Sequence, residues 1–297
     1  MFIPTDLGSR CLEKRAKVWR LRTQSLQFGK LPKLMGIVNV TPDSFSDGGK
    51  FHGTDQAIEH GLRLAEEGAD ILDVGGESTR PYADKVSETE ELQRVIPVIQ
   101  GLAEKTRVPI SIDTSKARVA REAIQAGAEI INDVTGLDGD PKMLETAVEL
   151  EAGVCAMHMR GTPQTMQDNP QYEHVVNDIY SYLNAKRDQL RQSGIETVRI
   201  CLDPGIGFGK THQHNLELMQ QCGTFHQLGC PILVGHSRKG FLAHVMEDKE
   251  TDRTAATIGS AIALLTQGIQ VIRVHDVLPL KQALTLFVAC GGITIAK

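Results

Sequence analysis

The sequence has few aromatic residues, no excess of basic charge, no paired cysteine motif and no long apolar run. Its 297 residues include 8 Phe, 4 Tyr and 1 Trp, so that aromatics make up 4%. The 32 Lys and Arg residues are outnumbered by 37 Asp and Glu, which gives a formal net charge of −5. Nucleic-acid binding needs a basic surface, and single-strand binding adds aromatic stacking platforms. We therefore expect no nucleic-acid partner.

The missing apolar runs and cysteine pairs exclude further classes. No stretch approaches the roughly 18 to 20 apolar residues that cross a bilayer, and residues 1–20 lack the apolar run of a secretory signal. The six cysteines are scattered, with no C-x-x-C pair. We therefore expect no membrane association, free thiols in a reducing cytoplasm and no structural zinc. With 41% hydrophobic residues, the chain is long and apolar enough for a large core.

Eight short runs of mostly apolar residues divide the sequence. A run that is apolar at nearly every position is typical of a strand buried on both faces, as in a parallel sheet. The runs are Leu34–Asn39, Ile71–Gly75, Ile110–Asp113, Ile130–Asn132, Val154–His158, Ile200–Asp203, Ile232–Gly235 and Val271–Val274.

Longer segments with helical periodicity lie between these runs. They are Thr54–Ala69, Lys116–Ala128, Pro141–Ala152, Tyr172–Ser193, His214–Leu228, Asp252–Gly268 and Leu278–Ala289. Thr54 and Asp55 are expected to cap the first of these helices, and Asp140 is a cap followed by proline at the first helical position of the third.

The alternation predicts one (β/α)8 barrel over residues 31–297, preceded by a short N-terminal extension over residues 1–30. We expect the extension, which contains Trp19, to close the bottom of the barrel, for instance as a hairpin. A doubly wound sheet is the alternative, but it usually has fewer strands and a single glycine-rich phosphate loop. No linker-like stretch divides the chain into two domains.

Charged and amide side chains stand at the ends of several predicted strands. They are Asp113, Asn132, Asp203 and Arg273. In a (β/α)8 barrel the active site forms at the C-terminal ends of the strands. A charge at the end of a buried strand must be paired or used. The alternatives are helix capping for Asp113 and Asp203 and a turn role for Asn132.

Eight motifs at these strand ends occur in a characteristic order. They are NVTPDSFSDGG (39–49), DVGGESTRP (73–81), DTSK (113–116), NDVTG (132–136), MHMRGTP (157–163), DPGIGFGK (203–210), SRKG (237–240) and RVHD (273–276). Together they resemble the dihydropteroate synthases of the folate pathway over about residues 34–290. The resemblance implies a transferase that joins 6-hydroxymethyl-7,8-dihydropterin pyrophosphate to para-aminobenzoate, forming 7,8-dihydropteroate and releasing pyrophosphate.

The resemblance also implies which residues bind the pterin. They are Asp113, Asn132, Asp203, Phe208 and Lys239. A carboxylate such as Asp203 suits the adjacent N–H donors of the pterin, and an amide such as Asn132 both donates and accepts. Phe208 is expected to cover the ring. Lys239, Arg273, Asp113 and Asp203 are implied as the catalytic residues.

By the same resemblance, Asn39, Arg273 and His275 bind the pyrophosphate, and Asn39 is associated with Mg²⁺. Arg273 and His275 alternate along one strand end, so both side chains can point the same way. Asn39 alone is a poor ligand for Mg²⁺, so we expect the ion to arrive mainly with the pyrophosphate. A lone histidine is more often structural, which stays open for His158 and His236.

The para-aminobenzoate site is implied to comprise Phe45, Thr79, Arg80, Pro81, Ser237 and Lys239. Most of these residues fall in two loops, Pro42–Gly53 and Gly75–Lys85, which we expect to be mobile and to close over the second substrate. Sulfonamides imitate para-aminobenzoate and are therefore expected as competitive inhibitors. No nucleophile stands beside a suitable base, so we expect an SN1-like substitution without a covalent enzyme intermediate.

Two other functions are alternatives to the transferase that the resemblance implies. A methyltetrahydrofolate–corrinoid methyltransferase shares the pterin-reading residues but needs neither the SRK and RVH groups nor the 39–49 loop. A non-catalytic paralogue would be favoured by loss of Arg273 or Lys239, and both are present.

His236 departs from the smaller or apolar residue that the family resemblance leads us to expect at this position. The resemblance further implies a homodimer, formed through late helices such as Asp252–Gly268.

Overall fold

The computed structural model describes residues 12–40, 50–79 and 83–293, and within them eight parallel strands form a barrel. The strands are β3 Lys33–Asn39, β4 Ile71–Gly75, β5 Ile110–Asp113, β6 Ile130–Asp133, β7 Gly153–Met157, β8 Ile200–Asp203, β9 Leu233–Val234 and β10 Val271–Val274. Their order is β8-β7-β6-β5-β4-β3-β10-β9, and a parallel bridge between Leu202 and Ile232 joins the two ends. The (β/α)8 barrel is confirmed, and the doubly wound sheet is excluded.

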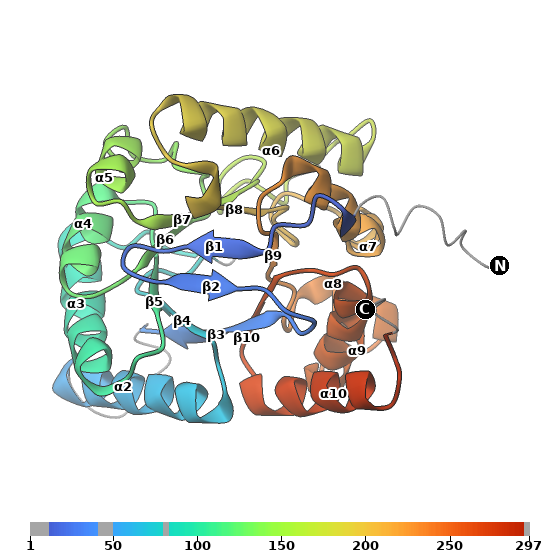
Figure 1. The fold of residues 1–297 in the computed structure, drawn as a ribbon, viewed down its shortest axis with the longest axis horizontal. Coiled ribbons are helices and arrows are strands. Elements are labelled where there is room, and N and C mark those ends of the chain that lie inside the picture. The colour runs from blue at the N-terminus through green and yellow to red at the C-terminus, as the bar shows by residue number, and fades with distance from the viewer. Residues whose placement is uncertain (1–11, 41–49, 80–82, 294–297) are drawn as a thin grey trace.

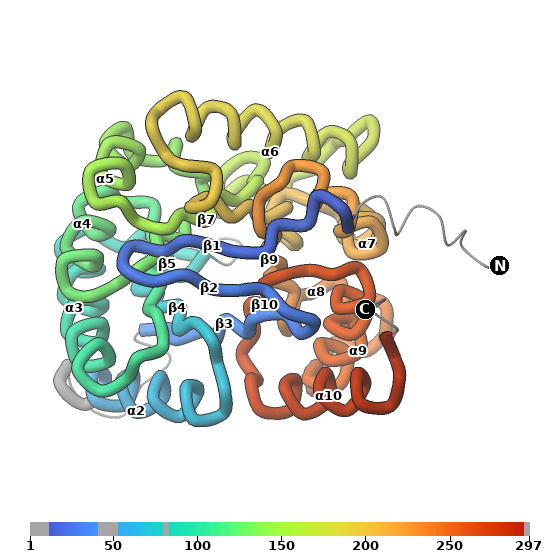
Figure 2. Tube along the Cα trace, viewed as in Figure 1, coloured from blue at the N-terminus to red at the C-terminus, as the bar shows by residue number. Residues whose placement is uncertain are grey.

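Helices form a ring around the strands, as Figure 1 shows in the view down the shortest axis and Figure 2 traces along the chain. They are α2 Lys50–Glu67, α3 Glu88–Lys105, α4 Ala117–Gln125, α5 Met143–Glu149, α6 Val175–Gln192, α7 His212–Gln221, α8 Gly240–Met246, α9 Thr254–Thr266 and α10 Val277–Ala289. Two 3₁₀ helices, η2 Thr197–Arg199 and η3 Cys222–Leu228, precede β8 and β9.

The sequence prediction differed from the structure at several helices. The segment predicted as one helix over His214–Leu228 is α7 followed by η3. It missed α3, although Ser87 caps it by accepting from the Glu90 N–H, and it missed the short α8. Helix α2 begins at Lys50, so Thr54 and Asp55 lie inside it and do not cap it. Helix α5 begins only at Met143, because the Asp140 carboxylate accepts from Lys142 N at 2.9 Å and from Ala117 N at 2.9 Å, which ties a turn to the start of α4.

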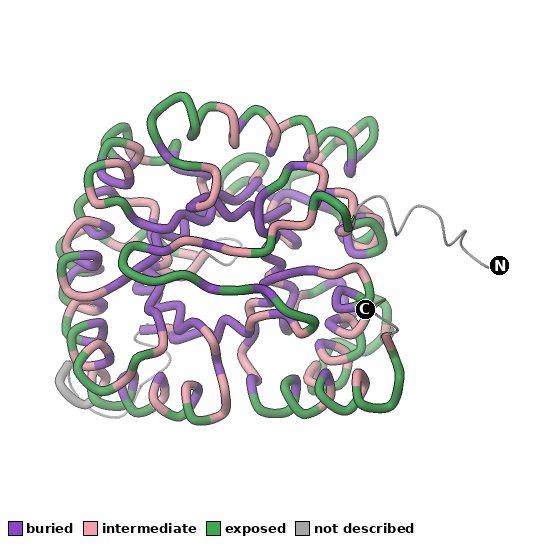
Figure 3. Tube along the Cα trace, in the orientation of Figure 1, coloured by how far each residue is buried: buried purple, intermediate pink, exposed green. Residues whose placement is uncertain are grey.

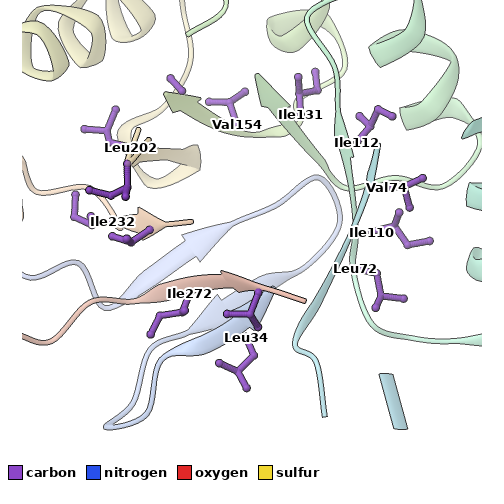
Figure 4. Close-up of a cluster of buried hydrophobic side chains, with 14 of the residues drawn as sticks. Leu34, Leu72, Val74, Ile110, Ile112, Ile131, Val154, Leu202, Ile232 and Ile272 are labelled. Carbon is purple, nitrogen blue, oxygen red and sulfur yellow. The ribbon is translucent and has the colours of Figure 1, made fainter. Parts of the chain in front are cut away.

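Apolar side chains fill the space between the strands and the helix ring. Figure 4 labels some of the residues that supply them, which include the strand residues Leu72, Val74, Ile110 and Ile112. In Figure 3 the barrel strands are mostly buried, whereas the outer helix surfaces are exposed. The strands are covered by the helices on their outer face and by other side chains in the barrel interior. Burial of both faces explains why the strand segments are nearly continuous apolar runs.

A hairpin of β1 Val18–Arg20 and β2 Ser25–Gln27 covers the N-terminal end of the barrel. In Figure 1 it lies across the strands inside the helix ring. Trp19 is fully buried, and its indole N–H donates to the Arg199 carbonyl at 2.9 Å. It belongs to one cluster with the lower interior side chains Met35, Ile71, Ile130, Cys155, Cys201, Leu233 and Val271. The described part of the extension therefore packs against the bottom of the barrel.

Candidate active site

The side chains that point into the barrel are apolar in the lower cluster. Two residues further toward the C-terminal end of the strands, the inward-pointing side chains are polar. Side chains two positions apart on a strand point to the same face. Asp73, Asn132, Asp203 and Arg273 therefore stand above Ile71, Ile130, Cys201 and Val271 of the lower cluster. Asp113 follows Ser111 in the same way. The upper layer lies at the C-terminal ends of the strands, where barrels of this kind carry their active sites.

Arg273 is held by two carboxylates from neighbouring strands. Its Nε donates to Asp73 Oδ2 at 2.6 Å, and an Nη donates to Asp113 Oδ2 at 2.8 Å. Asp73 is fully buried and also accepts from Asn132 Nδ2, at 3.2 Å for the nearer oxygen. Burial would lower the pKa of Arg273, but the charges of Asp73 and Asp113 raise it above its ordinary value. The guanidinium therefore stays charged.

Asp113 and Asp203 are carboxylates in a dehydrated setting. Burial raises the pKa of Asp113 to about 7, although the charge of Arg273 opposes the shift. Burial likewise raises the pKa of Asp203, and the Gly205 N–H, 2.7 Å from Oδ1, together with nearby lysines opposes it. Both groups can therefore accept hydrogen bonds from a ligand that replaces water at this end of the barrel.

Lys239 lies between Asp203 and the loop that follows β8. Its ammonium donates to the Ile206 carbonyl and lies 4.4 Å from the centre of the Phe208 ring. Burial lowers the pKa of Lys239 to about 7, with the Asp203 charge acting in the opposite direction. Lys239 and Phe208, both predicted from the sequence, are thus brought together on one side of the upper layer.

Asn39 and His275 line a groove of about 1110 Å³ between α2, the end of β3 and the start of α10. Ser237 Oγ lies 3.0 Å from His275 Nδ1 and accepts from the His275 backbone N–H at 3.3 Å. Arg238 borders the same groove and makes a two-pronged ion pair with Asp276, at 2.7 and 3.0 Å. Ser237, which is predicted to bind para-aminobenzoate, therefore contacts His275, which is predicted to bind pyrophosphate.

Of the predicted para-aminobenzoate residues, Phe45, Arg80 and Pro81 lie outside the described residues, and Thr79 is half-buried after β4. The segment before Thr79 is anchored by an ion-pair cluster. Lys116 donates to Glu77 and to the fully buried Glu91, at 2.5 Å for the latter. Glu77 also accepts from Val86 N at 3.1 Å, which joins the two ends of this loop.

The two histidines left open by the sequence are buried and neutral. His236 Nε2 lies 3.0 Å from the Thr257 carbonyl oxygen, and burial lowers the pKa of His236 to about 4. Burial, with the charge of nearby Lys210, lowers the pKa of His158 to about 3. His236 thus joins the turn after β9 to α9, which explains how a large residue is accommodated there.

Sequence reasoning missed two residues of the upper layer and its surroundings. Asp73 is two positions before the last residue of β4, so a search of strand ends passed over it, although its spacing from Ile71 matches that of Asn132 from Ile130. Lys210, the last residue of the DPGIGFGK motif, is almost fully buried. Its burial has no signal in the sequence, because it depends on contacts with His158, which follows β7.

The described side chains form neither a preformed metal site nor a membrane-spanning helix. Within residues 12–40, 53–79 and 83–293, no three His, Cys, Asp or Glu side chains converge as they would to hold a metal ion. Asn39 therefore needs oxygen ligands from elsewhere if it is to bind Mg²⁺. Among the described helices, none is long and apolar enough to cross a membrane. The five described cysteines are free thiols.

A barrel with this polar upper layer matches the pterin binding enzymes, whose family profile covers residues 35–275. The chain is 44% identical over 262 residues to dihydropteroate synthase of Haemophilus influenzae, covering 88% of this chain and 95% of the relative. It superposes with a TM-score of 0.86 at 40% identity on the Yersinia pestis dihydropteroate synthase solved with a sulfonamide drug, covering 93% of this chain and all of that one. The dihydropteroate synthase of Xanthomonas albilineans in complex with 7,8-dihydropteroate gives a TM-score of 0.84 at 38% identity, with the same coverage. The chain belongs to the dihydropteroate synthase family.

Proposed function

We propose that this protein catalyses the dihydropteroate synthase reaction, in which the amine of para-aminobenzoate displaces pyrophosphate from 6-hydroxymethyl-7,8-dihydropterin pyrophosphate. The observation that carries the proposal is the upper layer of the barrel, where buried carboxylates and an amide lie within reach of Arg273 and Lys239. This donor and acceptor set suits a flat heterocycle attached to a leaving anion.

The pterin would lie across the upper layer. Asp203 would accept two adjacent N–H donors of the pterin, while Asp113 and Asn132 would read its remaining edge. Lys239 would donate to the carbonyl and ring-nitrogen acceptors, and Phe208 would pack against the ring. Ordered hydrogen bonds in a dehydrated site discriminate strongly, because an unmatched buried group costs about 1–3 kcal/mol.

Charge stabilisation at the leaving group would come from Arg273 and His275. The bond between the pterin methylene and the pyrophosphate oxygen breaks, and its electron pair leaves with pyrophosphate. The electron-rich ring supports the cationic methylene, the amine nitrogen then forms the new C–N bond, and one proton passes to water. Fixed cations near the departing oxygen stabilise the charge that develops there. Among the described residues, no nucleophile is set up to intercept the cation.

Mg²⁺ is part of the proposal as a companion of the pyrophosphate. The Asn39 amide oxygen is a hard ligand at the right end of the barrel, and phosphate oxygens would complete the coordination. Bound there, the ion would neutralise charge on the leaving group. Para-aminobenzoate would be bound by Thr79, Ser237 and Lys239 with Phe45, Arg80 and Pro81, and sulfonamides would compete for the same residues.

The proposal extends to assembly and location. A homodimer, formed through late helices such as α9, is what the family resemblance implies, and analytical ultracentrifugation would detect it. A cytoplasmic location agrees with a chain whose described cysteines are all free thiols.

The direct test incubates the purified full-length chain with Mg²⁺, the pterin pyrophosphate and radiolabelled para-aminobenzoate. Labelled dihydropteroate and an equivalent amount of pyrophosphate are the expected products, and a sulfonamide should raise the apparent KM for para-aminobenzoate alone. The proposed function would be abandoned if a folded preparation formed no labelled product.

Asp203→Asn tests the placement of the pterin. An amide offers only one acceptor oxygen, so affinity for a free pterin should fall by about tenfold or more, the factor expected from losing a hydrogen bond to a charged group. Asp70→Asn is the matched control, because Asp70 pairs with Lys33 at the opposite end of the barrel. Unchanged pterin affinity in Asp203→Asn would place the head group elsewhere.

A further inference from the structure

The loop of residues 204–209, which joins β8 to α7, has one internal backbone hydrogen bond, from the Phe208 N–H to the Gly205 carbonyl at 3.1 Å, and is otherwise held by side chains. Four successive carbonyls, from Ile206 to Gly209, each accept a hydrogen bond from one side chain. The donors are Lys239 to Ile206, Gln167 to Gly207 at 2.9 Å, Lys210 to Phe208 at 2.8 Å and Tyr172 to Gly209 at 2.8 Å. Asn215 Oδ1 accepts from the Gly207 N–H at 2.7 Å.

The same loop is packed tightly against the end of β7. Gly205 and Gly209 adopt positive φ angles of +70° and +64°. A Cβ atom at Gly205 would lie 1.9 Å from the His158 carbonyl oxygen, and one at Gly209 would lie 2.5 Å from the Arg160 carbonyl oxygen. A glycine-rich backbone with a single internal hydrogen bond has much conformational freedom. Its shape therefore depends on the side chains that bind it.

Lys210 is the most deeply buried of these donors, with 2% of its surface exposed. Its Nζ lies 2.8 Å from the Phe208 carbonyl and 3.0 Å from His158 Nδ1. Among the described residues, no carboxylate lies within ion-pair distance of it, in contrast to the buried Lys186, which pairs with Asp138 at 2.6 Å. Burying an amine is costly unless its hydrogen bonds are made. The contacts of Lys210 are thus directed at the loop and at His158.

We propose that Lys210, together with His158, is a positioning residue that holds the 204–209 loop so that Phe208, Lys239 and Asp203 keep the geometry that reads the pterin. This inference rests on the proposed function, since it takes a pterin as the ligand.

The contacts explain how the effect reaches the ligand. The Phe208 carbonyl is held by Lys210, and the Phe208 ring lies under the Lys239 ammonium at 4.4 Å. At the other end of the loop, Asp203 accepts from the Gly205 N–H at 2.7 Å. A loop released at Phe208 changes the positions of the ring and the ammonium together. The loss should therefore be larger in pterin binding, which uses Phe208, Lys239 and Asp203, than in para-aminobenzoate binding, which shares only Lys239 with this group.

The test compares Lys210→Met, which removes the amine and keeps the length of the side chain, with Lys186→Met as a matched buried lysine. Both full-length variants are titrated calorimetrically with 6-hydroxymethylpterin, and their thermal unfolding and KM values are measured. Lys210→Met should bind the pterin about tenfold more weakly, as expected when a buried hydrogen-bonded amine is removed, with a smaller change in KM for para-aminobenzoate. Lys186→Met should lower Tm and leave pterin affinity unchanged.

His158→Leu provides a second route if Lys210→Met does not fold. It removes the imidazole partner and should also weaken pterin binding, and the two changes together should cost less than the sum of the separate losses. The inference is overturned if a folded Lys210→Met or His158→Leu binds pterin as the wild type does, or if Lys186→Met loses as much pterin affinity. A wild-type protein that binds no pterin would instead refute the proposed function.

Discussion

At the scale of single residues, Asp73 links the two halves of the proposed site. One of its oxygens accepts from Arg273 at 2.6 Å, and the carboxylate lies 3.2 and 3.3 Å from the amide nitrogen of Asn132. Arg273 is assigned to the pyrophosphate and Asn132 to the pterin. A fully buried carboxylate between them fixes both orientations at once, and it compensates the buried guanidinium.

Asp73→Asn should therefore reduce activity without abolishing the fold. The amide nitrogen would face another donor, either Arg273 or Asn132, and the guanidinium would lose one of its two charge partners. Hydrogen bonds to charged groups contribute about 1.5–3 kcal/mol, so kcat/KM should fall by roughly tenfold to a hundredfold. Steady-state kinetics with both substrates measures this.

Asp70→Asn serves as the control for Asp73→Asn. Asp70 immediately precedes β4 and pairs with Lys33 at 2.8 Å, three residues from Asp73 but at the opposite end of the strand. The kcat/KM of Asp70→Asn should stay close to that of the wild type. Equal losses in both variants would show that Asp73 acts only on general stability.

Lys239 makes stability depend on pH in a defined window. Its pKa is about 7 in the folded protein and 10.5 ordinarily. Below pH 7 both states carry the proton, so this group adds no pH dependence. Between those values the unfolded chain binds a proton that the folded chain does not, so stability should rise with pH. Urea denaturation from pH 6 to 10 should show the wild type gaining stability relative to Lys239→Met, whereas parallel curves would argue against the shift.

At the scale of elements, the β1–β2 hairpin covers the N-terminal end of the barrel and completes the core. The lower barrel interior is apolar, and the four hairpin residues that cover it, Trp19, Leu21, Leu26 and Phe28, are buried with it. Without them, side chains such as Met35 and Ile71 would face water. The hairpin lies at the opposite end of the strands from the upper layer, so stability and chemistry are separated along the barrel axis.

Trp19→Ala should destabilise the protein by about 3–5 kcal/mol, since it leaves a large cavity and removes the hydrogen bond to the Arg199 carbonyl. The activity of the molecules that remain folded should change little. Circular dichroism is the suitable probe of unfolding, because Trp19 is the only tryptophan in the chain. A variant of wild-type stability would show that the hairpin does not contribute to the core.

Element prediction succeeded where burial produced a simple pattern. The eight barrel strands were recognised because both faces are covered, and β4, β5, β8 and β10 have the predicted bounds. Helix α3 was missed although Ser87 and an acidic first turn mark its start, and Pro97 lies unusually in its interior. The ends of α2 and α5 depend on neighbouring segments, such as the contact of Asp140 with α4, which local sequence does not reveal.

At the scale of the whole molecule, the net charge of −5 gives no long-range attraction for a pyrophosphate-bearing substrate. The cations of the upper layer are also largely matched by Asp73, Asp113 and Asp203. The association rate of the pterin pyrophosphate should therefore not fall when salt is raised from about 20 to about 200 mM, a range over which steered association slows steeply. Stopped-flow measurements would reveal a tenfold fall if steering operated.

The sequence by itself determined the barrel, the motifs at its strand ends and most of the residue types that the chemistry needs, because periodicity and strand ends are local features. Only the tertiary structure decided which of these side chains meet. Arg273 contacts Asp73 although 200 residues separate them, because β10 and β4 both flank β3 in the barrel. Lys210 reaches His158 because the ends of β7 and β8 are neighbours. Such contacts depend on strand register and packing, which no local pattern encodes.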